Sequence, residues 1–206
     1  MNMNKKIILA SGSSIRQKIF SNAGISFLTD PANIDEESIK FSLEQIKKSH
    51  EEITQTLSDF KGLNRINSWP NDLIISCDQI LSFNGEIFSK PTNKGTAIKQ
   101  IKKLNGSKHF LITASTIIEN SEIIWRDISK AEMFMRNLSD NQIIDYVETI
   151  GVECTKSVGG YMIEKEGIKL FKKITGDYFA ILGIPLTKII NFLFEKDFLN
   201  DFTKKK

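Results

Sequence analysis

Short apolar segments alternate with polar ones along this chain, and their spacing predicts both strands and helices. Residues 7–10 form an apolar run typical of a buried strand, and a turn of serine and glycine follows at once. Ile15, Ile19 and Phe20 then recur at helical spacing, and Gly24 is placed to end that helix. The first 24 residues therefore predict a strand, a tight turn and a helix.

The turn between that strand and helix has the composition of an anion-binding site. Ser13 or Ser14 can cap the helix, and Gln17 stands three residues after Ser14, as in a capping box. Free N–H groups and the helix dipole favour an anion at such an end, and Arg16 adds a possible bidentate clamp. From these residues alone, an ordinary capped junction with a solvated arginine remains equally open.

The rest of the pattern mixes strands and helices without strict alternation. In chain order it predicts a strand at 25–28, two helices between 35 and 67, a buried strand at 73–81, a hairpin return at 86–88, a helix near 97–104, long strands near 109–118 and 123–135, a helix from Ser139 to before Gly151, and a last helix begun by Pro185. We therefore expect an α/β fold with a mixed, twisted sheet.

Composition narrows the class of protein. With 206 residues, 40% of them hydrophobic, the chain suits one domain spanning residues 1–206, or two lobes sharing a sheet. A formal charge of +3 is too small to indicate nucleic-acid binding, and we interpret the lysines at 204–206 as a frayed basic tail. The apolar run at 7–10 is too short for a signal peptide or a membrane span, so we expect no membrane partner.

The few cysteines and histidines exclude several kinds of chemistry. Two cysteines give no disulfide framework or zinc spacing, and two histidines cannot supply a multi-histidine metal site. A reducing cytosol suits such a chain. Thiol catalysis by Cys77 is disfavoured, since strand alternation points Cys77 away from the face of Asp78 and no histidine is near it in sequence.

Asp78 is the first catalytic candidate, because it is an acid inside an apolar run. Its burial carries a desolvation cost unless the carboxylate is paired, hydrogen-bonded or bound to a metal, and we expect it where the strand leaves the core. Lys90 returns towards it across the predicted hairpin at Asn84 and Gly85. An architectural acid–lysine pair remains the alternative for Asp78, a solvated side chain the alternative for Lys90, and a helix cap the simpler interpretation of the acidic turn at 35–36.

Eight short segments, in order and spacing, resemble the Maf-like nucleotide pyrophosphatases. They are Ala10-Ser11-Gly12-Ser13-Ser14-Ile15-Arg16, Asp35-Glu36, Lys61, Ser76-Cys77-Asp78-Gln79, Gly85-Glu86 with Lys90-Pro91, Leu104-Asn105-Gly106, Gly159-Gly160-Tyr161 and Leu182-Gly183-Ile184-Pro185. The resemblance covers nearly the whole chain. It implies an elongated α/β fold with two lobes and a central cleft, similar in architecture to house-cleaning inosine triphosphatases.

The resemblance also implies a function. It implies a cytoplasmic, homodimeric hydrolase that uses a divalent cation, Mg²⁺ or Mn²⁺, to split a nucleoside triphosphate between the α and β phosphates into a monophosphate and pyrophosphate. The site residues it implies are Ser11, Ser13 and Arg16 on the phosphates, Lys61 and Lys90 as further cations, Asp78 as the acid that activates water or holds the metal, and Glu36 as a second acid in the cleft. A nucleotide-sensing regulator of cell division is the alternative, although a pure binder has little reason to bury an acid beside phosphate.

Three departures from the family pattern bear on the substrate. Ser14-Ile15-Arg16 has one arginine where many members have two, and Cys77-Asp78-Gln79 with the apolar Ile15 resembles the 7-methyl-GTP subgroup. Glu164 stands where thymidine- and uridine-preferring members have glutamine, and a carboxylate can accept hydrogen bonds but cannot donate one. The resemblance therefore places Gln79 and Glu164 near the substrate and favours a modified purine nucleotide.

Overall fold

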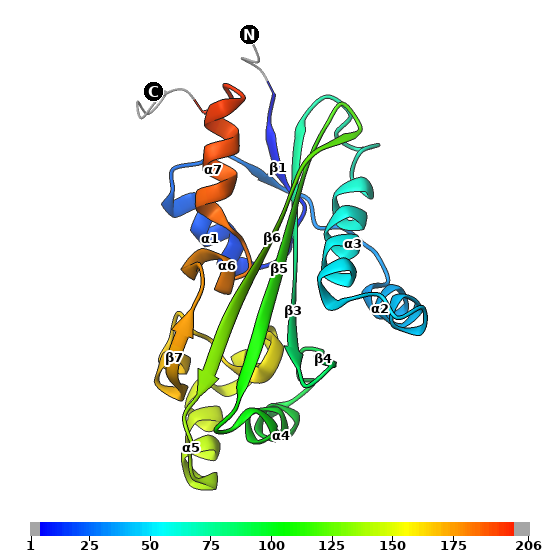
Figure 1. Ribbon diagram of the computed structural model, residues 1–206. Coiled ribbons are helices and arrows are strands. Elements are labelled where there is room, and N and C mark those ends of the chain that lie inside the picture. The colour runs from blue at the N-terminus through cyan, green and yellow to red at the C-terminus, as the bar shows by residue number, and fades with distance from the viewer. Residues whose placement is uncertain (1–4, 200–206) are drawn as a thin grey trace.

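A mixed seven-stranded sheet forms the centre of the computed structural model, which describes residues 5–199 (Figure 1). Within that range the strands are β1 (Ile7–Leu9), β2 (Leu28–Thr29), β3 (Leu73–Phe83), β4 (Glu86–Phe88), β5 (Lys108–Glu119), β6 (Glu122–Met135) and β7 (Phe171–Thr175). Their order is β2-β1-β3-β5-β6-β7, and β4 also pairs with β3. β1 pairs in parallel with β2 and with β3, whereas the pairs β3–β5, β5–β6 and β6–β7 are antiparallel. This confirms the predicted mixed α/β sheet.

Helices cover both faces of this sheet. They are α1 (Ser14–Asn22), α2 (Glu36–Gln45), α3 (His50–Leu63), α4 (Lys94–Leu104), α5 (Asp140–Ile150), α6 (Tyr178–Ile181) and α7 (Leu186–Glu195), with 3-10 helices η1 (Gly151–Lys156), η2 (Val158–Gly160) and η3 (Glu166–Leu170). In Figure 1, α1, α6 and α7 lie on one side of the long strands, α2 and α3 lie on the other, and α4 and α5 lie at the far end from α7. None of the helices described is both long and apolar enough to span a bilayer.

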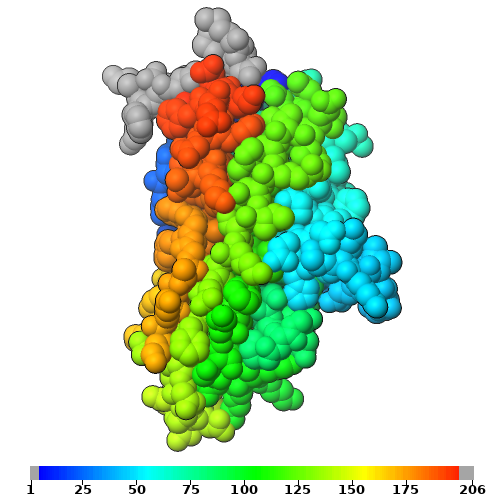
Figure 2. All heavy atoms as spheres, viewed as in Figure 1, coloured from blue at the N-terminus to red at the C-terminus, as the bar shows by residue number. Residues whose placement is uncertain are grey.

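The molecule is elongated, and the long hairpin of β5 and β6 runs along its length (Figure 1 and Figure 2). Asn120 and Ser121, with φ values of 51° and 66°, form its tight turn, and this left-handed backbone is what a two-residue hairpin requires. Hydrophobic clusters lie towards both ends of the long strands, one centred on Leu81 and Ile101, the other on Ile75 and Ile189. The sheet runs through both, so two lobes with a cleft between them stay a prediction.

Alternation along β3 decides which side chains meet which helices. Ser76 and Asp78 face α3, whereas Cys77 and Gln79 face the side of α1 and α6. The predicted opposition of Cys77 and Asp78 is therefore confirmed. Asp78 pairs with Ala114 in the middle of β3, so the expectation that it lies where the strand leaves the core is wrong: the strand continues to Phe83.

Other local predictions need correction. Ser13 is the cap of α1 and accepts from the Arg16 N–H, so a capping box between Ser14 and Gln17 does not form. The strand expected at 25–28 is shorter and later, since only residues 28–29 pair with β1. The pattern gave no sign of β7, which is short and mostly exposed at the sheet edge. The expected basic tail at 204–206 lies outside the described residues.

The capping prediction at Ser139 is confirmed. Its hydroxyl accepts from the Gln142 N–H and the Gln142 side chain accepts from the Ser139 N–H, so α5 begins with a complete capping box. The cap at Asp35 is confirmed in the same way, because its carboxylate accepts from the Ser38 N–H at the start of α2. This cap leaves the next residue, Glu36, available to the site.

Candidate active site

Three charged side chains from three elements meet on the α3 face of the sheet. Lys61, in the last turn of α3, places its Nζ 2.5 Å from Asp78 Oδ1 and 2.9 Å from Glu36 Oε2. Asp78 is 4% exposed, and its other carboxylate oxygen has no hydrogen-bond partner among the described residues. We call Glu36, Lys61 and Asp78 the Asp78 cluster.

The orphaned oxygen of Asp78 separates this cluster from a purely architectural ion pair. A buried carboxylate is expected to have its oxygens paired or hydrogen-bonded, and an unpaired one carries a desolvation cost. Lys61 binds only the Oδ1 oxygen of Asp78. Glu36, the second partner of Lys61, is more exposed, with 42% of its side chain accessible. The cluster therefore keeps one buried acceptor free for another group.

Two of the three guanidinium nitrogens of Arg16 donate hydrogen bonds to other residues of the protein. Its Nε donates to the Gly183 carbonyl at 2.7 Å, and its Nη1 donates to the Cys77 carbonyl at 2.7 Å and to Ser11 Oγ at 3.1 Å. The Ser11 hydroxyl also accepts from the Ser13 N–H at 3.3 Å. The clamp expected here thus joins the turn after β1 to β3 and to the segment before α7. Nη2 has no hydrogen-bond partner within residues 5–199 and remains for an anion.

Gly183 allows this approach because it lacks a side chain. Its φ is +93°, and a Cβ there would lie 3.1 Å from both Nε and Nη2 of Arg16. The family motif contains Gly183 but assigns it no role, and nothing in the sequence indicates that the Cys77 carbonyl binds Arg16. Backbone acceptors leave no side-chain signal in a sequence.

Lys90 joins the same electrostatic neighbourhood. Its side chain is exposed at the surface, yet partial burial of the ammonium lowers its pKa, and the nearby charges of Arg16 and Lys61 lower that pKa further. Glu36 and Asp78 act on it in the opposite direction. The structure therefore joins Lys61 to Asp78 and Glu36 by direct ion pairs, and brings the charges of Arg16 and Lys90 close enough to influence one another.

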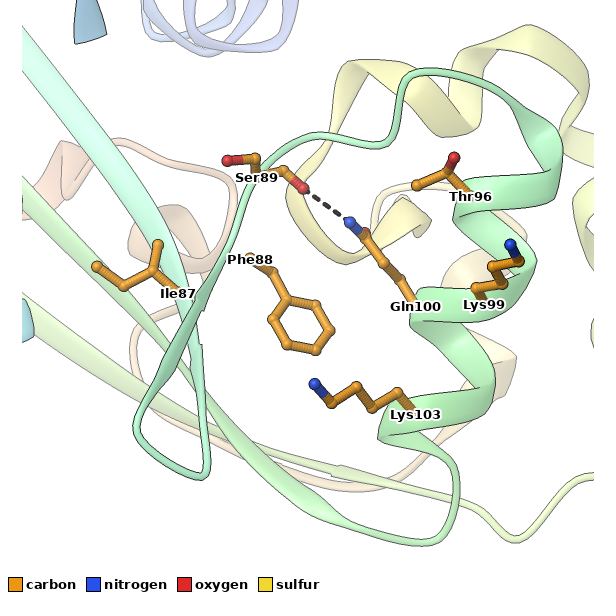
Figure 3. A pocket seen from close by; sticks show the side chains of 7 residues that line it. All are labelled: Ile87, Phe88, Ser89, Thr96, Lys99, Gln100 and Lys103. Atoms are coloured by element: carbon orange, nitrogen blue, oxygen red, sulfur yellow. Dashed lines mark hydrogen bonds between the residues drawn. The ribbon is translucent and has the colours of Figure 1, made fainter. Parts of the chain in front are cut away.

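The segment before Lys90 is held from both sides. The Ser89 hydroxyl lies 3.3 Å from a Glu37 carboxylate oxygen, and the Ser89 carbonyl accepts from Gln100 Nε2 at 2.9 Å. Figure 3 shows this last bond at the rim of a pocket of about 250 Å³ between β4 and α4. The pocket is lined by Ile87, Phe88, Ser89, Thr96, Lys99, Gln100 and Lys103.

Gln79 and Glu164 are not brought to the cluster. The Gln79 amide donates to the carbonyls of Ala180 and Ile181, both at 3.0 Å, and to Thr113 Oγ1 at 2.9 Å, on the opposite face of β3. The half-buried Glu164 lies near Tyr146, and within residues 5–199 no hydrogen bond or ion pair joins it to Glu36, Lys61 or Asp78. Gln79 ties α6 to the sheet, and its expected contact with the substrate stays a prediction.

A magnesium ion suits the oxygens that this site offers. Residues 5–199 contain no group of three or more His, Cys, Asp or Glu side chains arranged to hold a metal. Mg²⁺, however, keeps several waters and is commonly held by only one or two carboxylates together with phosphate oxygens. Asp78, with its free oxygen, and Glu36 fit that requirement.

Comparison with known proteins finds relatives over nearly the whole chain. The family model of Maf-like proteins matches residues 6–196. A nucleoside triphosphate pyrophosphatase of Ruegeria pomeroyi is 37% identical over 191 residues, which cover 93% of this chain and 96% of that protein. A 7-methyl-GTP pyrophosphatase of Brucella abortus biovar 1 is 38% identical over 188 residues, which cover 91% of this chain and 94% of that protein.

Proposed function

Because the chain belongs to the family of Maf-like proteins, we propose that it is a nucleoside triphosphate pyrophosphatase that splits the bond between the α and β phosphates of its substrate. The observation that carries the proposal is the Asp78 cluster, in which a buried acid with a free oxygen is paired with Lys61, with the charge of Lys90 nearby. Such a set of charges suits a polyphosphate and a water molecule better than it suits a passive interface.

Hydrolysis of a phosphoanhydride depends mainly on position and charge. Lys61, Lys90 and the free Nη2 of Arg16 would neutralise phosphate oxygens and the charge that develops on the leaving pyrophosphate. The N–H groups at the start of α1, after the Ser13 cap, add donors to the same anion. Lys61 is paired with two carboxylates in the structure, so phosphate binding would exchange one charged partner for another.

Asp78 and Glu36 would hold Mg²⁺ or Mn²⁺, which when bound supplies Lewis-acid stabilisation of phosphate oxygens. Asp78 would orient the attacking water or take its proton. Because its free oxygen is buried, a hydrogen bond or a cation at that oxygen is not screened by bulk water.

Three finer points belong to the same proposal. The substrate is a modified or non-canonical nucleotide, with 7-methyl-GTP as the first candidate, supported by the name of the Brucella relative and by Glu164 in place of glutamine. The protein acts in the cytoplasm, which its two unpaired cysteines suit. It works as a homodimer, a proposal that rests on the family resemblance alone.

Isotope labelling tests the reaction directly. The protein is incubated in ¹⁸O-water with Mg²⁺ or Mn²⁺ and a panel of canonical and methylated triphosphates, and the products are analysed by mass spectrometry. We expect pyrophosphate release with the label in the nucleoside monophosphate, because water attacks the α phosphorus, and no release in EDTA. Label in pyrophosphate, release of orthophosphate, or binding of every nucleotide without turnover contradicts the proposal.

A further inference from the structure

Two buried serines join α3 to β3 directly beside the Asp78 cluster. Ser58 and Ser76 are both fully buried, and the Ser76 hydroxyl donates to the Ser58 carbonyl at 2.7 Å. The Ser58 hydroxyl lies 3.2 Å from the Ser76 carbonyl and 3.0 Å from Thr116 Oγ1. A polar link therefore crosses an interface that is otherwise a helix packed on a sheet.

These serines lie at the same place along both elements as the ion pair. Ser76 precedes Asp78 by two residues, so alternation directs both side chains to the α3 face of β3. Ser58 precedes Lys61 by three residues, which is about one helical turn. Any sliding of α3 along β3 would change the Ser76–Ser58 distance and the Lys61–Asp78 distance together.

Gly62 sets how closely the helix approaches. A Cβ on Gly62 would lie 2.7 Å from Ile118 Cδ1 and 2.8 Å from Ser76 Oγ, which leaves no room for a methyl group. The glycine lets α3 approach the sheet, and the hydrogen bond of Ser76 holds it at that height. The close packing at Gly62 and the directional bond of Ser76 together define one position of the helix on the sheet.

We propose that Ser76, through its hydrogen bond to the Ser58 carbonyl, is a positioning residue for the pyrophosphatase reaction, because it fixes α3 where Lys61 reaches Asp78. This inference rests on the proposed function of the Asp78 cluster. Ser76 touches neither substrate nor reacting atoms. Its effect is to keep the Lys61 ammonium within hydrogen-bond distance of a buried carboxylate, and small displacements of reacting groups are costly in enzymes.

Replacing Ser76 tests this without disrupting the core. The Ser58 carbonyl keeps the i to i+4 bond of its own helix, so Ser76→Ala leaves no unpaired acceptor and creates little empty space. Ser115→Ala is the matched control: Ser115 is equally buried, pairs across the sheet with Cys77, and bonds its Sγ at 3.2 Å on the opposite face. Both variants should lose a similar, small amount of thermal stability.

Of these two serine variants, only Ser76→Ala should affect the reaction. We expect its kcat to fall about tenfold with KM changed less, while Ser115→Ala keeps the activity of the unmodified protein. Gly62→Ala, which pushes α3 outward by the methyl contact, should lower kcat in the same direction. An unchanged kcat in a folded Ser76→Ala protein, or an equal loss in Ser115→Ala, overturns the inference.

A measurement that does not depend on activity separates this inference from the proposed function. The ¹³C resonance of the Asp78 carboxyl, assigned by its disappearance in Asp78→Asn, should move in Ser76→Ala and stay in place in Ser115→Ala. If Asp78→Asn is fully active, the proposed function is wrong, and this resonance still decides whether Ser76 positions the ion pair. A resonance that does not move in Ser76→Ala refutes the positioning role.

Discussion

Acidification should destabilise the protein through His109. This side chain is fully buried on β5, its Nε2 lies 2.7 Å from the Tyr161 hydroxyl, and its Nδ1 has no hydrogen-bond partner within residues 5–199. The rings of Tyr161 and Phe171 pack beside it, with centroids 5.7 and 5.9 Å away. No carboxylate is hydrogen-bonded to it in the described part of the chain, so a protonated imidazole would be a buried and uncompensated charge.

Burial lowers the pKa of His109 from 6.5 to about 4, and the sign of the effect on stability follows. The unfolded chain takes up a proton below pH 6.5, whereas the folded protein resists doing so until about pH 4. The stabilising contribution of neutral His109 is therefore complete above pH 6.5 and is lost as the pH falls towards 4. At about 1.4 kcal/mol per unit of pKa, the loss is roughly 2 kcal/mol by pH 5 and roughly 3 kcal/mol by pH 4.

Chemical denaturation at a series of pH values measures this loss. The free energy of unfolding is determined in urea between pH 7 and pH 4 for the unmodified protein and for His109→Gln, which does not titrate and can still bond the Tyr161 hydroxyl. The advantage of the unmodified protein over His109→Gln should shrink by about 3 kcal/mol across this range. His50→Gln, measured in parallel, gives the share of the other histidine. A difference between the two proteins that is independent of pH refutes the reasoning.

Three further outcomes are expected. Gly183→Ala should lower both activity and stability, because its Cβ would press on Arg16. Gly85→Ala is the control: its φ is a similar +81°, no atom lies within 4 Å of its Cβ, and it should lose only about 1 kcal/mol of stability to backbone strain. Equal losses of activity in the two variants would contradict the role of Gly183. Burial raises the pKa of the Cys77 thiol, so iodoacetamide should spare Cys77 in the folded protein, and Cys77→Ala should keep its turnover; an inactive but folded Cys77→Ala would revive thiol catalysis. Glu164→Gln should shift the relative kcat/KM among bases more than it changes turnover, and an unchanged substrate profile would remove Glu164 from base recognition.

Where side-chain periodicity and capping chemistry act locally, the sequence predicts the structure well. Ser139 and Gln142 form the expected capping box, and the apolar run with one acid at 73–81 is the central strand β3. The order of the strands in the sheet cannot be predicted in this way, because it depends on contacts between residues far apart in the sequence. β1 pairs with β3 through residues such as Ile7 and Leu73, which are 66 positions apart. Pattern alone gives no access to such pairings, and the short edge strand β7 carries too few buried residues to leave a periodic signal.

The same distinction between local pattern and long-range contact applies to the candidate site. The buried acid at Asp78 can be recognised from its apolar surroundings. Its ion pair with Lys61, and that of Lys61 with Glu36, form only when α3 packs against β3 and α2 against α3. The binding of Arg16 to two carbonyl oxygens could not be predicted, because any residue can supply a carbonyl. The bonds of the Gln79 amide to the Ala180 and Ile181 carbonyls could not be predicted for the same reason.

The central claim is that the acid in the Asp78 cluster performs the chemistry, and the turnover of Asp78→Asn tests it most directly. Asparagine keeps the shape of the side chain and removes its charge, while Glu36 remains to pair with Lys61, so the protein should stay folded. With a methylated or canonical triphosphate that the unmodified protein hydrolyses, we expect pyrophosphate release to fall by about 10²–10³ at an unchanged folded content by circular dichroism. Full turnover by a folded Asp78→Asn protein would contradict the account.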